Sequence, residues 1–263
     1  MKPEQITFAQ DDFPDSYEDG CHAGDEVSTL PENCSFGSTE SDVHIYLLGD
    51  SRANQFFTPI RDVATQLDAK FTSRTRTGCA VSDVTLMTGE VEYANCNSWR
   101  AEAVAEVLQL KPDLVIMSSA TNLRILDPVT GVRATSDRAK EMYVAGIQKI
   151  VSDLSQAGIK VILIRDTPRF KSSPLDCLSA YLPAGCRYPV AESVIDPRFS
   201  SAAVKDIPNV LPVDLTLALC GTQICETVRD GQIVWRDTHH ITNSYARLLT
   251  PMFSELISSE LSK

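Results

Sequence analysis

The stretch VHIYLLGDSRAN, residues 43–54, decides the fold. Residues 43–48 form an apolar run rich in β-branched and aromatic side chains, which is typical of a buried strand. After the run, apolar residues recur at the three- and four-residue steps of a helix, at Phe56, Ile60, Val63 and Leu67. Ser51 therefore lies at the carboxyl end of a buried strand, on the turn into a helix, where open α/β sheets bind their ligands.

Ser51 has two interpretations. As a nucleophile, it would use the free N–H groups and the partial positive charge at a helix start, which suit a developing oxyanion. Alternatively, Asp50 or Ser51 is only the N-cap of the helix. An isolated Gly-Asp-Ser favours the cap, so the rest of the chain has to decide.

Composition limits the classes of partner. The chain has 263 residues, of which 43% are hydrophobic and 22% charged, as in one large or two small globular domains. It shows no apolar run of membrane-spanning length and does not begin with a signal peptide. The net charge of −11 argues against nucleic acid and anionic membranes, and favours a neutral or sugar-like substrate.

The eight cysteines fall into four close pairs along the chain. The pairs are Cys21 and Cys34, Cys79 and Cys96, Cys177 and Cys186, and Cys220 and Cys225. None lies in a CxxC motif or in a Cys/His cluster with zinc spacing. Pairing of nearest neighbours would close four local loops, so we expect four disulfides and an extracytoplasmic fragment of a longer protein. The alternative is eight reduced, buried cysteines in a cytosolic enzyme.

The remaining pattern alternates strands and helices. Buried strands are expected at 114–117 and 159–164, a short strand at 210–213, an edge strand at 70–75, and helices at 98–110, 137–157 and from 242 or 243 onward. This order predicts an α/β fold, a three-layer α/β/α sandwich with a mostly parallel five-stranded sheet in the order 2-1-3-4-5. A hairpin should turn at 230–231, and residues 169–198 should be irregular.

The acidic first 41 residues lack periodicity. We expect residues 1–41 to be a linker that docks on the domain through the Cys21–Cys34 disulfide, and residues 42–263 to form the catalytic domain.

A nucleophilic serine needs a base, and the chain has four histidines. His22 lies in the acidic segment and His44 opens the first strand, so neither is expected at the carboxyl edge of the sheet. His239 and His240 follow Asp237 on a loop. A carboxylate three residues before His240 can hold the imidazole Nδ1 while Nε2 faces the serine. The alternative is a solvated surface turn.

Five blocks together resemble the SGNH, or GDSL-like, hydrolase superfamily. They are LLGDSRANQF at 47–56, TGCAV at 77–81, IRDTPRF at 164–170, VDLTLALC at 213–220 and WRDTHHIT at 235–242. More narrowly, the chain is similar to the extracytoplasmic SGNH domains fused to multi-span membrane acyltransferases that O-acetylate cell-envelope glycans and lipids. The cysteine pairs that flank these blocks match as well.

The resemblance implies a role for each matching position. Ser51 would be the nucleophile and, through its N–H, an oxyanion donor; Gly78 would supply a second N–H. His240, rather than His239, would be the general base, and Asp237 would orient it. The family's third block, Gly-x-Asn-Asp, corresponds to residues 120–123, which read Ala-Thr-Asn-Leu.

The third block departs from the family at Ala120 and Leu123. Asn122 is therefore either an oxyanion donor through its amide or an ordinary polar residue at a strand end.

The implied function is transfer of an acetyl group, through an acyl-serine, to a hydroxyl of an envelope glycan or glycolipid. The alternatives are an acetylesterase with the same triad and a non-catalytic glycan-binding module. The resemblance implies no metal and no cofactor bound by this domain. Acetyl-CoA would be the ultimate donor, through a membrane domain of the same polypeptide that tethers this monomeric domain outside the cytoplasm.

Overall fold

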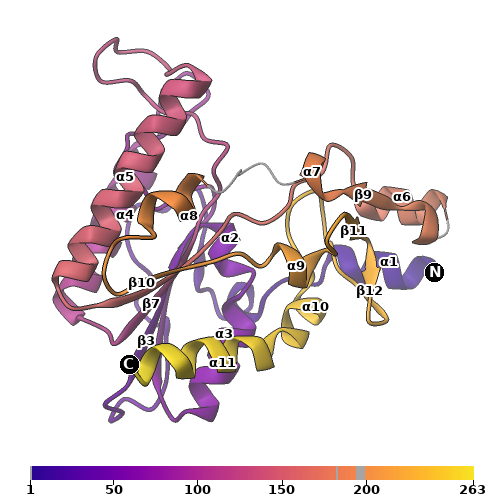
Figure 1. Cartoon of the computed structure of the whole chain (residues 1–263), viewed down its shortest axis with the longest axis horizontal. Coiled ribbons are helices and arrows are strands. Elements are labelled where there is room, and N and C mark those ends of the chain that lie inside the picture. The colour runs from indigo at the N-terminus through magenta and orange to yellow at the C-terminus, as the bar shows by residue number, and fades with distance from the viewer. Residues whose placement is uncertain (1, 182, 194–198) are drawn as a thin grey trace.

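A mostly parallel sheet runs through the centre of the molecule (Figure 1). The structure is a computed structural model that describes residues 2–181, 183–193 and 199–263. Five parallel strands lie in the order β4 (Lys70–Arg76), β3 (His44–Gly49), β7 (Leu114–Ser118), β8 (Lys160–Ile164) and β10 (Val210–Val213). Numbered along the chain, this is the order 2-1-3-4-5, which confirms the predicted α/β sandwich.

The sheet has seven strands, so the expected number of five was wrong. Two short strands from the N-terminal segment pair with β4: β1 (His22–Ala23) is parallel to it and β2 (Ser35–Gly37) is antiparallel. The strand expected at the edge, β4, therefore has neighbours on both sides, and its residues from Phe71 to Arg76 are buried. Composition did not reveal this pairing, because it joins segments far apart in the sequence.

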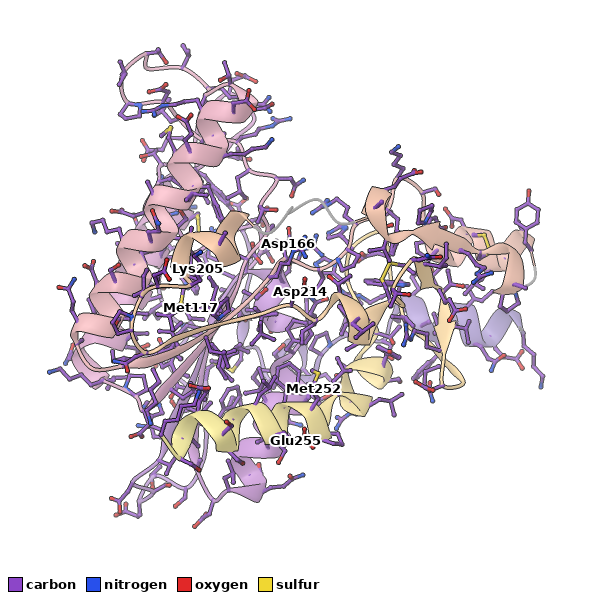
Figure 2. The ribbon with its side chains drawn as sticks, viewed as in Figure 1. Met117, Asp166, Lys205, Asp214, Met252 and Glu255 are labelled. Atoms are coloured by element: carbon purple, nitrogen blue, oxygen red, sulfur yellow. A yellow bond between two sulfur atoms is a disulfide. The ribbon has the colours of Figure 1, made fainter. Side chains whose placement is uncertain are left out.

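Helices cover both faces of the sheet and create two apolar cores. One face carries α2 (Ser51–Asn54), α3 (Phe57–Gln66), α10 (Asn243–Leu248) and α11 (Thr250–Leu261). The other carries α4 (Ala94–Leu110), α5 (Ser136–Gln156) and α8 (Phe199–Val204). Met252 on α11 packs against the first core, and Met117 on β7 belongs to the second (Figure 2). Burial on both faces explains why the central strands read as continuous apolar runs.

Two helices differ from the expected ranges. The helix expected from residue 98 begins at Ala94. The last helix is interrupted after Leu248, and α11 begins again with Pro251 in its first turn. Proline is tolerated there because the first N–H groups of a helix have no partner within the helix.

Short elements form a lobe beside the sheet, at the right of Figure 1. They include α1 (Pro3–Gln10), α6 (Pro174–Ala180), β9 (Arg187–Pro189), α7 (Val190–Ser193), α9 (Thr216–Leu219), β11 (Ile224–Glu226), β12 (Val228–Arg229) and β13 (Gln232–Ile233). The expected hairpin is present, with Asp230 and Gly231 at positive φ between β12 and β13. The region expected to be irregular contains α6, β9 and α7, and its residues 182 and 194–198 lie outside the described ranges.

The remaining short elements are the 3₁₀ turns η1 (Asp15–Tyr17) and η2 (Pro183–Gly185), and the antiparallel pair β5 (Met87–Thr88) and β6 (Val91–Glu92). In the described ranges, no helix combines the length and apolar composition that a bilayer span requires.

Four disulfides join the cysteines as predicted. They are Cys21–Cys34, Cys79–Cys96, Cys177–Cys186 and Cys220–Cys225. The first lies between η1 and β2 and spans β1, so it holds the two N-terminal strands beside β4.

Candidate active site

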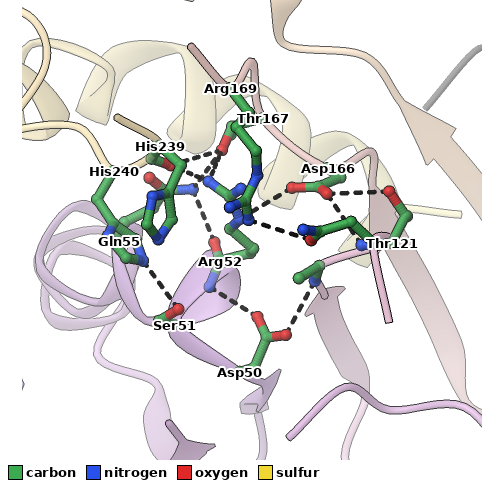
Figure 3. A network of polar contacts seen from close by, with 12 residues as sticks. Asp50, Ser51, Arg52, Gln55, Thr121, Asp166, Thr167, Arg169, His239 and His240 are labelled. Atoms are coloured by element: carbon green, nitrogen blue, oxygen red, sulfur yellow. Dashed lines mark hydrogen bonds and ion pairs between the residues drawn. The ribbon is translucent and has the colours of Figure 1, made fainter. Parts of the chain in front are cut away.

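Ser51, His240 and Asp237 form one hydrogen-bonded line at the carboxyl edge of the sheet. Ser51 Oγ lies 2.8 Å from His240 Nε2, and His240 Nδ1 lies 2.7 Å from Asp237 Oδ2 (Figure 3 shows the Ser51 side of this site). Ser51 opens α2 directly after β3, whereas the other two residues come from the loop before α10. This geometry corresponds to a nucleophile, a general base and a group that orients the base.

The turn that carries Ser51 depends on Gly49. A Cβ at Gly49 would lie 2.1 Å from the Ser118 carbonyl oxygen and 2.6 Å from Ala53 Cβ. No side chain fits in that space, so glycine lets α2 begin directly against the ends of β3 and β7.

Asp50 is the N-cap of α2 and ties two strand ends together. Its carboxylate accepts the N–H of Arg52 at 2.8 Å and the N–H of Ala120, just after β7, at 2.9 Å. Burial raises the pKa of Asp50 to about 6, although both N–H groups and the Arg52 charge act in the opposite direction. The capping interpretation therefore holds for Asp50, and the Ser51 hydroxyl contacts His240.

Asp237 organises the loop that carries the imidazole. Its Oδ1 accepts the backbone N–H groups of His239 at 2.7 Å and His240 at 2.8 Å, which leaves Oδ2 for the His240 ring. The Arg236 N–H donates a hydrogen bond to the His240 carbonyl at 2.9 Å, which closes the loop around Asp237. Both oxygens of one carboxylate thus fix the backbone and the ring of the same residue.

The protonation states suit a general base at neutral pH. Burial lowers the pKa of His240 below its ordinary value, although the Asp237 carboxylate acts in the opposite direction. Burial opposes ionisation of Asp237, but its bond to His240 and the neighbouring imidazoles hold the pKa of that carboxyl well below its usual range. The pair is therefore a carboxylate beside a neutral imidazole, which can accept a proton from Ser51.

The His239 ring lies beside Asp237, with its Nδ1 3.4 Å from Oδ1, but does not contact Ser51 in the way that His240 does. The same Nδ1 lies 2.9 Å from Thr238 Oγ1, and the His239 carbonyl accepts a hydrogen bond from Arg52. Burial, with the charges of His240 and Arg52, lowers the pKa of His239 to about 3. Of the two adjacent histidines, His240 is the one in contact with Ser51.

A buried ion pair that sequence reasoning missed supports the site from behind. Arg52 is 0% exposed, and its Nε lies 2.9 Å from Asp166 Oδ1, just after β8 (Figure 3). Arg52 Nη1 also donates to Thr167 Oγ1 at 2.9 Å and to the carbonyl of His239. Arg52 and Asp166 lie in two of the blocks that carried the family resemblance, but their spacing in the sequence could not show that they pair.

Gln55 adds a second link between the same elements. Its amide nitrogen donates to Thr167 Oγ1 at 3.2 Å, and its amide oxygen accepts the Ile241 N–H at 3.1 Å. The turn at Ser51, the end of β8 and the loop at His240 are thus connected by polar contacts through α2.

Gly78 lies on the loop that follows β4. Since the strand register pairs Thr75 with Gly49, this loop leaves the sheet beside the turn that carries Ser51. Gly78 has a φ of +60°, which glycine adopts without strain, and the next residue is held by the Cys79–Cys96 disulfide.

Asn122 is exposed on the segment after β7. Its side-chain oxygen accepts a hydrogen bond from Arg169 Nη2 at 3.1 Å. Any donation to an oxyanion would therefore have to come from its amide nitrogen.

His22 lies at the carboxyl edge of the sheet, so the expectation that it is poorly placed was wrong. Its Nδ1 lies 3.0 Å from Thr75 Oγ1 and its Nε2 3.2 Å from Thr77 Oγ1, at the base of the Gly78 loop. Burial lowers the pKa of His22 to about 3, and the nearby charges of Arg236 and Arg76 act in the same direction. Its place depends on the pairing of β1 with β4, which has no local signal. His44, as expected, lies at the other end of β3.

Asp237, His239 and His240 also offer three ligand atoms within 4.8 Å of one another, a spacing that a metal ion accepts. Both ring nitrogens of His240 already have partners in Asp237 and Ser51. The hydrogen-bonded line therefore accounts for this cluster.

A serine, a histidine and an aspartate are aligned at the carboxyl edge of a parallel sheet. This arrangement places the chain among α/β proteins with a site like that of serine hydrolases. Within that class, the chain belongs to the SGNH domains that are fused to AT3 domains, because the profile of this family matches residues 20–255. No curated protein sequence matches it.

A solved structure with a similar fold is the periplasmic domain of a lipopolysaccharide acetyltransferase from Salmonella ser. Paratyphi A. The similarity covers 97% of both chains with a TM-score of 0.67, at 15% sequence identity.

Proposed function

We propose that the domain is a serine-dependent O-acetyltransferase that moves an acetyl group onto a hydroxyl of a cell-envelope glycan or glycolipid. The observation that carries this proposal is the unbroken line from Ser51 Oγ through the His240 ring to the Asp237 carboxylate. Membership of the SGNH domains fused to AT3 domains supports it, as does the fold shared with a lipopolysaccharide acetyltransferase domain.

The reaction proceeds in two steps. In the first, His240 Nε2 takes the proton of Ser51 Oγ as that oxygen attacks the acetyl carbonyl; the donor's bond to the acyl carbon then breaks, and the leaving group takes the proton from His240. In the second, an acceptor hydroxyl gives its proton to His240 and attacks the acyl-serine, and Ser51 Oγ leaves with that proton. The N–H groups of Ser51 and Gly78, with the Asn122 amide, stabilise the oxyanion.

The acetyl group is supplied by a membrane acyltransferase domain of the same polypeptide, with acetyl-CoA as the ultimate donor on the cytoplasmic side. This domain itself binds no cofactor and works outside the cytoplasm as a monomer. Four disulfides, which persist in oxidising compartments, support that location.

A serine-directed fluorophosphonate tests the proposal on the isolated chain. We expect it to label Ser51 and to block cleavage of p-nitrophenyl acetate. Ser51→Ala and His240→Ala should each lower that cleavage by about 10⁴-fold or more, because the members of a triad act as a unit.

The matched control is His239→Ala, which removes the neighbouring imidazole, 3.4 Å from Asp237 Oδ1, but leaves all three members of the line in place and should cost far less. Absence of labelling would favour the non-catalytic glycan-binding module. Labelling with release of acetate, but no acetylated product when saccharide acceptors are supplied, would favour the acetylesterase.

A further inference from the structure

A cavity of about 430 Å³ lies beside the candidate active site, between the segment that follows β7 and the start of α5. Its charged lining residues are Arg124, Arg133 and Lys140, and no acidic side chain lines it. The whole chain, by contrast, has 35 acidic and 24 basic side chains. An all-cationic cavity is thus the opposite of what the overall charge of the protein predicts.

The three cations are available to an external anion. Arg133 is exposed and has no ion pair within the described ranges of the chain. Lys140 is 59% exposed, and its only ion pair with a described residue is a loose contact of 3.8 Å to Asp137. Arg124 is exposed and donates one N–H to the Gly89 carbonyl at a distance of 3.4 Å.

Two of the nearby acids are already paired with a cation that does not line the cavity. Arg138 lies 3.7 Å from Asp127 and 3.3 Å from Glu141, so this fourth cation already neutralises part of the acidic charge around the cavity.

The walls of the cavity are ordered by backbone contacts. The Ala134 N–H donates to the Ile125 carbonyl at 2.8 Å, and Leu126 forms an antiparallel bridge with Arg133. These contacts close residues 125–134 into a hairpin-like loop that holds Arg124 and Arg133 on one side of the cavity.

The same segment is tied to the catalytic turn. Thr121, which lines the cavity, donates its N–H and its hydroxyl to Asp166 Oδ2, both at 3.0 Å (Figure 3). Asp166 pairs in turn with Arg52, the residue after Ser51. Asn122, the next lining residue, contacts Arg169, which adds another cation at the junction. The wall of the cavity is therefore linked to the turn of Ser51 by a chain of hydrogen bonds and one ion pair.

We infer that this cavity binds the acceptor and that the acceptor is an anionic saccharide, a glycan whose sugars carry carboxylate or phosphate groups. The inference rests on the proposed function, since it assigns a substrate class to that site. Arginine and lysine recognise carboxylate and phosphate, and the hydroxyl and amide groups of Thr121, Asn122 and Ser136 suit sugar hydroxyls.

Calorimetric titration of the Ser51→Ala protein tests the inference without turnover. The probes are tetragalacturonate and the neutral maltotetraose, at low ionic strength. We expect tetragalacturonate to bind about tenfold more tightly or better, and its affinity to fall with added salt. Arg133→Glu and Lys140→Glu should each weaken its binding by about fivefold or more, because each places a like charge against the ligand.

The matched control is Lys111→Glu, which makes the same charge change at an exposed residue before β7, at the opposite edge of the sheet. It should change the affinity by less than about twofold, since a charge at the far edge makes no contact with the ligand and acts only through solvent of high dielectric constant. Melting temperatures of all three variants show that they are folded.

The inference would be overturned if maltotetraose bound as tightly as tetragalacturonate. It would also be overturned if Arg133→Glu and Lys140→Glu weakened binding no more than Lys111→Glu does. Titration with galacturonate and glucose 6-phosphate shows which anionic group is preferred, and either preference supports it. If inorganic phosphate binds as tightly as galacturonate and glucose 6-phosphate, the cavity does not recognise a saccharide and the inference is overturned. Cleavage of p-nitrophenyl acetate by the wild-type protein reports on the proposed function separately, because that small neutral ester does not need the cavity.

Discussion

The His240 ring has a partner at each nitrogen, and this fixes what its proton can do. Because Asp237 holds Nδ1, the free electron pair of the neutral ring lies on Nε2, toward the Ser51 hydroxyl. Burial makes the charged ring unfavourable, so the basic form persists to lower pH than in a solvent-exposed histidine.

The pH dependence of activity follows from that shift. Cleavage of p-nitrophenyl acetate should rise as His240 loses its proton, with a midpoint below the unperturbed histidine value of about 6.5. A pH profile of kcat/KM measures the midpoint in the free enzyme. A midpoint clearly above 6.5 would mean that the Asp237 carboxylate dominates over burial.

The short helix α2 connects three parts of the fold. It begins at the end of β3, and Arg52 and Gln55 connect it to the end of β8 and to the loop before α10. Burying an ion pair is costly, so this pair is weak evidence for net stability, and we propose that it serves to hold α2 in position.

Arg52→Ala tests this role. The change leaves the Asp166 carboxylate without its cation and should lower the free energy of unfolding by about 3–5 kcal/mol. It should also reduce esterase activity, because the His239 carbonyl loses a donor. Urea unfolding and the esterase assay measure the two effects.

Arg138→Ala is the matched control, since that arginine is 45% exposed and should cost about 1 kcal/mol or less. Similar losses in the two variants would contradict a special role for the buried pair.

Local sequence signals account for part of this architecture. The apolar run and glycine at 43–49 predicted the strand and the turn at Ser51, and the spacing of Asp237 and His240 predicted their contact. The positions of His22, Arg52 and Asp166 depend on pairings between distant segments. Neither periodicity nor turn chemistry encodes such pairings, so the two extra strands and the buried ion pair could be found only in the folded chain.

The buried histidines should make the free energy of unfolding decrease in acid. Burial lowers the pKa of His22 and His239 to about 3 and of His44 to about 4. Unfolded chains protonate these rings near pH 6.5, so the unfolded state binds more protons as the pH falls. The raised pKa of Asp50, about 6, acts in the opposite direction but for one group only.

We therefore expect the melting temperature to fall by several degrees between pH 7 and pH 4.5. Scanning calorimetry checks this. His44→Gln should make the melting temperature depend less on pH, because it removes one such ring at the far end of β3. The glutamine amide can still bond to Thr72, whose Oγ1 lies 2.9 Å from His44 Nε2. A melting temperature that stays constant or rises toward pH 4.5 would refute the assignment.

Charge is distributed unevenly over the molecule. A net charge of −11 suggested a neutral substrate, yet the cavity beside the site is lined by three cations. Overall charge governs solubility and long-range encounter, whereas the substrate class depends on the groups that touch it.

We propose that Ser51 carries the acetyl group during turnover, and trapping the acyl-serine is the sharpest test of that role. The protein is mixed with p-nitrophenyl acetate, quenched in acid within the first turnover and digested for mass spectrometry. We expect one acetyl group on the peptide that contains Ser51, and none on that peptide in Ser51→Ala. Turnover that continues in Ser51→Ala, or an acetyl group found only on another residue, would contradict it.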